Sequence, residues 1–167
     1  GGTSVADLDR IRNAAQRVKR AYDAGDQVTV VVSAMSGETN RLVGLVQEAS
    51  PLHDAREYDN VVASGEQVTC GLMAIVLQSM GVPARSFLGW QVPVKTDDAH
   101  GRARIMDIEP ENLVHRMEKG IVCVVAGFQG VSGSGSVTTL GRGGSDTSAV
   151  ALAAALGAER CDIFTDV

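Results

Sequence analysis

The residues best suited to carry chemistry are an arginine flanked by glycines and a glutamate that follows one glycine, each ahead of an apolar run. Arg142 lies in the stretch TTLGRGGSDT, and Glu66 lies in ASGEQVT. A guanidinium in such a setting suits two-pronged binding of a carboxylate or a phosphate, and a carboxylate suits an ammonium group. Each residue also has an ordinary explanation. Arg142 would then be a solvated loop arginine, and Glu66 would be a favourable charge at a helix N-terminus. Together they predict recognition of an α-amino acid.

The elements that must position these residues follow from hydrophobic spacing and from helix-ending glycines. Helices are predicted over 5–24, 39–49, 67–81, 110–120 and 143–156, and buried strands over 27–34, 82–89, 121–127 and 161–167. Helices and apolar strands alternate, which predicts one α/β domain with a parallel or mixed sheet between helical layers.

Three local details go with this assignment. Thr39 or Asn40 is expected to cap the helix that runs to about Ala49. Ser64, Gly65 and Glu66 are expected to interrupt the helical stretch around them. The Gly/Ser-rich segment 128–137 is expected to be a mobile loop.

Polar, glycine-bearing segments follow several of the predicted strands. They are SAMSGETN after the first strand, GFQG and then TLGRGGSD after the third, and TDV at the end. Ligands of open α/β sheets collect at the carboxyl ends of the strands, so these segments predict a binding site there. Each segment taken singly is also an ordinary strand-to-helix turn.

Composition and missing motifs exclude several classes of function. The 167 residues carry a net charge of −5 with no basic tract, which argues against a nucleic-acid partner. No apolar stretch is expected to reach the roughly 18 residues of a membrane span. Three dispersed cysteines predict reduced, buried thiols and a cytoplasmic protein. The sequence lacks GxxxxGK[ST], GxGxxG, HExxH and GxSxG, and its three histidines share no metal spacing, so no protein-bound metal is predicted.

Seven segments, taken in order, resemble the aspartate kinases of the amino-acid-kinase superfamily. They are GGTSV, VVVSAMSGETN, ASGEQVT, HGRARI, VVAGFQG, TTLGRGGSDTSAVALAAALGA and CDIFTDV. The resemblance implies a three-layer αβα sandwich with a mainly parallel central sheet, occupying residues 1–167. It also implies ATP-dependent phosphorylation of the β-carboxylate of L-aspartate with Mg²⁺, giving 4-phospho-L-aspartate, the first step towards lysine, threonine and methionine.

The resemblance also implies individual roles. Arg142 would bind the α-carboxylate of aspartate, Glu66 would bind its amino group, and Thr39 would line the same site. Gly143, Gly144 and Ser145 would add hydrogen-bond donors, with Ser145 and Asp146 in the catalytic group. The ATP site would include Gly1, Gly2, Thr3, Ser4, Ser33, Thr165 and Asp166.

The sequence departs from the family pattern in two places. The family motif begins Lys-Phe-Gly-Gly or Lys-Tyr-Gly-Gly, whereas this sequence opens at the glycines, and Glu38 replaces an apolar residue. The ends are therefore expected to be cuts, with the segment that completes the ATP pocket and the regulatory ACT domains absent.

Two alternatives stay open. One is a related kinase that acts on glutamate, acetylglutamate or a nucleotide, and the other is a catalytically inactive substrate-binding fragment. The full-length protein is expected to be a homo-oligomer.

Overall fold

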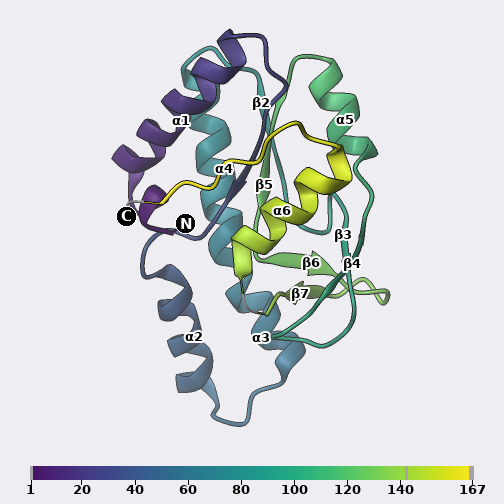
Figure 1. Cartoon of the computed structure of the whole chain (residues 1–167). Coiled ribbons are helices and arrows are strands. Elements are labelled where there is room, and N and C mark those ends of the chain that lie inside the picture. The colour runs from purple at the N-terminus through teal and green to yellow at the C-terminus, as the bar shows by residue number, and fades with distance from the viewer. Residues whose placement is uncertain (1, 142, 166–167) are drawn as a thin grey trace.

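The computed structural model describes residues 2–141 and 143–165, and Figure 1 shows their arrangement. A short 3-10 turn, η1 (Gly2–Val5), precedes the first helix. The helices are α1 (Leu8–Asp23), α2 (Glu38–Ala49), α3 (Ala55–Val62), α4 (Ser64–Ser79), α5 (Glu111–Glu118) and α6 (Gly144–Leu156). The strands are β1 (Thr29–Val32), β2 (Ala84–Phe87), β3 (Val94–Thr96), β4 (Ile105–Ile108), β5 (Val122–Ala126), β6 (Gln129–Val131) and β7 (Val137–Thr139).

The central sheet is parallel, in the order β1-β5-β2. Along β5, Val122 and Val124 pack into one apolar cluster with α1 and α4, and Cys123 and Val125 pack into another with α5 and α6. Because alternate side chains of a strand face opposite ways, β5 is buried on both faces, which explains its unbroken apolar sequence. The predicted three-layer αβα arrangement is confirmed.

A second sheet, in the order β4-β3-β6-β7, was not predicted. The expected mobile loop over 128–137 instead contains β6 and the first residue of β7, which pair antiparallel with Gln129 opposite Thr139, and residues 132–136 form the turn between them. Its glycines suggested a loop, but Gly130 serves close packing, because a Cβ there would lie 2.5 Å from the Val94 carbonyl oxygen on β3.

The interruption expected at Ser64, Gly65 and Glu66 is also misplaced. The helical run breaks at Ala63, and these three residues form the first turn of α4. By length and composition, helical residues 55–79 could cross a membrane, which contradicts the expectation from sequence. However, 56% of the most apolar window is buried inside the protein, and α4 places Met73 and Leu77 in the core. A core helix of a folded domain passes the same test.

The strand predicted over 161–167 is not formed within its described residues, 161–165. This segment crosses the molecule in an irregular conformation and ends near the N-terminus, where Ser4 Oγ donates to the Phe164 carbonyl oxygen at 3.3 Å (Figure 1). Ile163 and Phe164 remain about half exposed. Because no described strand pairs with this segment, the backbone hydrogen bonds that define a strand are missing.

Candidate functional site

A cavity of about 300 Å³ opens beside the carboxyl end of β1. It lies between β1, α1, the start of α6 and the segment 162–165. Five residues predicted for catalysis or ATP binding line it: Ser4, Ser33, Ser145, Asp146 and Thr165. The expectation that polar segments gather at the carboxyl edge of the sheet is therefore met for this group of residues.

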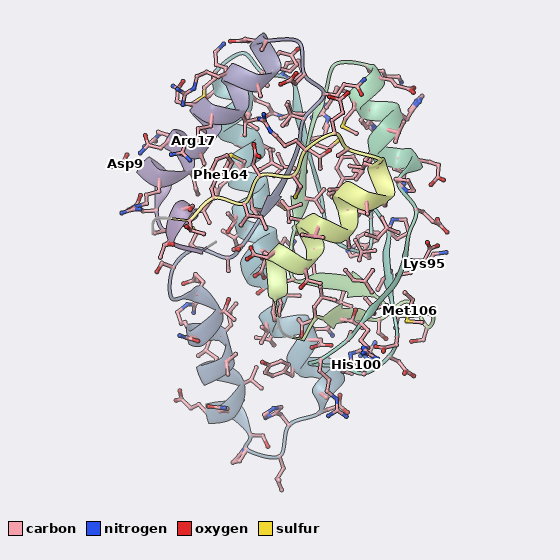
Figure 2. The ribbon with its side chains drawn as sticks, in the orientation of Figure 1. Asp9, Arg17, Lys95, His100, Met106 and Phe164 are labelled. Atoms are coloured by element: carbon pink, nitrogen blue, oxygen red, sulfur yellow. The ribbon has the colours of Figure 1, made fainter. Side chains whose placement is uncertain are left out.

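The α1 side of the cavity carries cationic side chains that the sequence did not single out. Arg10 and Arg17 line it together with Asn13. The Arg17 guanidinium lies 4.8 Å from the centre of the Phe164 ring, and Figure 2 shows the two side chains next to each other. Positive charge on this wall favours an anionic group beside α1, while Asp146 and Asp162 place two carboxylates elsewhere in the same lining.

Two glycines shape the entrance to α6. Gly143 and Gly144 have φ values of 90° and 42°, a left-handed conformation that side chains rarely adopt. A Cβ on Gly143 would also overlap the Thr147 hydroxyl. The turn therefore requires glycine and places the start of α6 beside the cavity.

Close packing fixes the first turn of α6 against the end of β5. A Cβ placed on Gly127 would lie 2.8 Å from Ser145 Oγ and 2.9 Å from Ser145 Cβ. Gly127 thus lets Ser145 approach the backbone that follows β5. Ser145 and its neighbour Asp146 come from α6, whereas Ser33 directly follows β1, so these two parts of the fold meet at the cavity.

Glu66 is buried in the first turn of α4, with only 3% of its surface exposed. Its Oε1 accepts a hydrogen bond from the Ala34 amide at 3.2 Å, but Oε2 has no partner among the described residues. Burial raises the pKa of the Glu66 carboxyl to about 7. A buried carboxylate oxygen without a donor is costly, so it is expected to have a partner that the described residues do not supply.

The elements around Glu66 approach one another closely. A Cβ on Gly65 would lie 2.9 Å from Ala34 Cβ and 3.4 Å from Leu42 on α2. Glu66 does not line the cavity itself, but its partner Ala34 follows Ser33, which does. The segment between β1 and α2 therefore contacts both sites: Ser33 lines the cavity, and the next residue, Ala34, binds the Glu66 carboxylate.

Thr39 lies half-buried in the first turn of α2. Neither Thr39 nor Asn40 caps this helix, because the cap position is occupied by Gly37 in a left-handed conformation. Glu38 forms two hydrogen bonds with Arg41, both at 3.0 Å, which hold the pKa of its carboxyl below the usual value. The negative charge that distinguishes this sequence at Glu38 is therefore paired with a cation of its own helix.

The structure adds a residue that sequence reasoning missed. Phe128 is the only described non-glycine residue with positive φ, at 68°. Its amide donates to Ser148 Oγ at 2.9 Å, and its carbonyl accepts from Leu140 at 2.9 Å. Its ring lies against Gly144 at the entrance to α6. Strained backbone of this kind clusters at functional sites. The flanking glycines of GFQG were the available signal.

The remaining predicted site residues fall into two groups. Gly2 and Thr3 belong to η1, and a Cβ on Gly2 would lie 3.2 Å from the Ala34 carbonyl oxygen. Gly1, Arg142 and Asp166 lie outside the described residues. Within residues 2–141 and 143–165, no three His, Cys, Asp or Glu side chains group closely enough to hold a metal ion.

Fold and site together define a class of protein. The sequence profile of the amino acid kinase family matches residues 1–167, so the chain belongs to that family. Within the family, it is 54% identical to the aspartokinase of Pseudomonas aeruginosa over 167 residues. This match covers 100% of the chain but only 40% of the relative, so the chain spans less than half the length of such relatives.

Solved structures agree with the sequence comparison. Aspartate kinase from Synechocystis superimposes with a TM-score of 0.85 at 46% identity, covering 100% of this chain and 27% of that one. Aspartokinase III of Escherichia coli, in complex with aspartate and ADP, has a TM-score of 0.84 at 30% identity and covers 100% and 48%. The fold of the chain is that of the aspartate kinases.

Proposed function

We propose that the protein to which this chain belongs phosphorylates the β-carboxylate of L-aspartate with ATP, giving 4-phospho-L-aspartate. The observation that carries the proposal is Glu66 Oε2, a buried carboxylate oxygen with no partner among the described residues. The ammonium group of an amino acid supplies the missing donor. The complex of E. coli aspartokinase III with aspartate and ADP supports this choice of substrate.

In this proposal a clamp of opposite charges binds aspartate. Glu66 binds the ammonium group, and Arg142 binds the α-carboxylate through two parallel hydrogen bonds. Thr39, Gly143, Gly144 and Ser145 surround the substrate with further hydrogen-bonding groups. Because both ends of the amino acid are then fixed, the β-carboxylate has one direction in which to extend.

The phosphates of ATP are assigned to the cavity beside β1. Ser4, Ser33 and Thr165 line it, and Arg10 and Arg17 make one wall cationic. Gly1, Gly2, Thr3 and Asp166 complete the proposed ATP site. The lining of the cavity by Ser145 and Asp146 supports their assignment to the catalytic group, with Asp146 orienting the reacting groups. Transfer of this kind depends on placement and charge neutralisation and needs no covalent enzyme intermediate.

Mg²⁺ fits this site as an ion that arrives with ATP. Magnesium is commonly held by one or two carboxylates together with substrate phosphates. Asp146 and Asp162 line the cavity, so one of these carboxylates could complete such a coordination sphere. When bound, the ion would neutralise charge on the phosphates.

An acceptor panel tests the proposal. The full-length protein is incubated with ATP, Mg²⁺, hydroxylamine and one of L-aspartate, L-glutamate or N-acetylglutamate, and acyl hydroxamate is measured. ATP consumption is followed separately with nucleoside monophosphates. We expect hydroxamate with aspartate alone and none without ATP. Turnover of another acceptor in place of aspartate would favour the related kinases, and turnover of none would favour a binding protein.

The remaining assignments stay predictions. They are the regulatory ACT domains outside this chain, the homo-oligomeric state of the full-length protein and its cytoplasmic location.

A further inference from the structure

A second buried carboxylate, which the proposed reaction does not use, lies seven residues before Glu66 in the helical run formed by α3 and α4. Asp59 on α3 is 0% exposed. Its carboxylate accepts hydrogen bonds from Thr139 Oγ1 at 2.6 Å, from the Gly101 amide at 3.0 Å and from His100 Nδ1 at 2.7 Å. These donors come from β7 and from the loop between β3 and β4, so one carboxylate connects three parts of the fold.

Asp59 and Glu66 lie on one side of the helical run formed by α3 and α4. They are seven residues apart, close to two helical turns, and both are buried. The run is also fixed between them, since Gln129 Nε2 on β6 donates to the Ala63 carbonyl oxygen at 2.8 Å where α3 gives way to α4. Buried hydrogen bonds from β6 and β7 therefore hold the helical run that carries Glu66 in place.

The groups that Asp59 binds are joined to the backbone leading to Arg142. The Ala103 amide donates to the Thr139 carbonyl oxygen at 2.9 Å, and the Gly141 amide donates to the Ala103 carbonyl oxygen at 3.3 Å. Residues 101–103 and 139–141 therefore form one hydrogen-bonded unit. Arg142 is the next residue in the sequence.

We propose that Asp59 is a positioning residue for the aspartate clamp: it holds residues 139–141, which precede Arg142 in the sequence, at a fixed place relative to Glu66. This inference rests on the proposed function. Figure 2 places His100, one of the Asp59 partners, at the end of the molecule where α3 lies, away from Arg17 and Phe164 beside the cavity. Asp59 is fully buried and both of its carboxylate oxygens already accept protein donors, so it acts through Thr139 and the loop without touching substrate.

The strand β7 offers a matched pair of variants. Thr138 and Thr139 are neighbours, both 0% exposed, and both have bonded hydroxyls. Thr139 binds Asp59, whereas Thr138 Oγ1 lies 2.7 Å from Thr96 Oγ1. Thr139→Val removes the link to Asp59 at nearly constant shape, Thr139→Ser keeps it, and Thr138→Val removes a buried hydroxyl bond that does not involve Asp59.

The experiment uses the full-length protein and two readouts. Calorimetry gives the Kd for L-aspartate, and hydrogen exchange reports the protection of peptides covering residues 140–146. We expect Thr139→Val to raise the aspartate Kd about tenfold, as loss of one buried hydrogen bond to a charged group does. The same variant should raise exchange in 140–146. Thr139→Ser and Thr138→Val should stay within about twofold of wild type, an effect below one weak hydrogen bond.

Equal effects of Thr139→Val and Thr138→Val, or no effect of Thr139→Val, would overturn the inference. If Thr139→Val does not fold, Asp59→Asn replaces it, since it leaves one side-chain oxygen for three donors, and the same two outcomes decide. If wild-type protein does not bind aspartate, the proposed function fails. The exchange readout then still decides whether Asp59 positions residues 139–141.

Discussion

At the residue scale, Glu66 combines burial, one hydrogen bond and one unpartnered oxygen. Because burial raises its pKa to about 7, from 4.5, the folded protein holds this proton more tightly than the unfolded chain does. The contribution of Glu66 to the free energy of unfolding therefore falls as pH rises from about 4.5 to 7 and is constant above that range. A ligand ammonium group would favour the charged form and reverse this penalty.

The affinity for aspartate is consequently expected to depend on pH. Pairing with an ammonium group needs the ionised carboxylate. The Kd for L-aspartate should therefore rise about tenfold for each unit that the pH falls below 7, and it should be constant above pH 7. Calorimetry between pH 5.5 and 8.5 measures this. Glu66→Gln should bind aspartate weakly with no such slope. A wild-type slope that survives in Glu66→Gln would assign the titration to another group.

Arg142 carries the other charge of the proposed clamp. Arg142→Ala should raise the KM for aspartate roughly 10- to 100-fold, the range expected for losing hydrogen bonds to a charged group. The KM for ATP should change little, because the ATP site is assigned to other residues. Steady-state kinetics of the full-length protein separate the two constants. Unchanged aspartate kinetics would remove Arg142 from the substrate site.

At the scale of elements, glycines set how closely the helices reach the site. Gly127→Ala should lower the free energy of unfolding by about 1–3 kcal/mol, because its Cβ would press on Ser145. Gly71 in α4 is the control, since a Cβ there meets nothing within 4 Å. Gly71→Ala should raise stability by about 0.5–1 kcal/mol through helix propensity. Urea unfolding measures both. A neutral Gly127→Ala would show that α6 can move away from β5.

The same glycines mark what the sequence could and could not predict. The strand β5 and the helix α1 were predictable from sequence. A strand buried on both faces has an unbroken apolar sequence, whereas a helix buried on one face has apolar residues three and four positions apart. The β6–β7 pair was missed, because Gly130 and its serine-rich surroundings resemble a loop while the glycine in fact admits a neighbouring strand. Glu66 was identified from its motif, but its unpartnered oxygen depends on packing against Ala34, which no local pattern encodes.

At the scale of the molecule, the central sheet separates two apolar clusters, one beneath α1 and α4 and one beneath α5 and α6. Leu77 belongs to the first and Leu113 to the second, and both are 0% exposed. Since β5 contributes side chains to both clusters, the two are expected to unfold together.

Leu77→Ala and Leu113→Ala should each lower the free energy of unfolding by about 2–5 kcal/mol. Both variants should keep a single transition in urea when followed by circular dichroism. Leu52→Ala, at a side chain that is 95% exposed, is the control and should change stability by less than about 0.5 kcal/mol. Separate transitions for the two clusters would contradict a shared core.

The most direct measurement of the central claim is a crystal structure of the full-length protein with L-aspartate bound. We predict that the aspartate ammonium group lies within about 2.8–3.2 Å of Glu66 Oε2, the oxygen that lacks a partner among the described residues, with the α-carboxylate on Arg142. Aspartate bound elsewhere, with Glu66 Oε2 still lacking a donor, would contradict the assignment of this site.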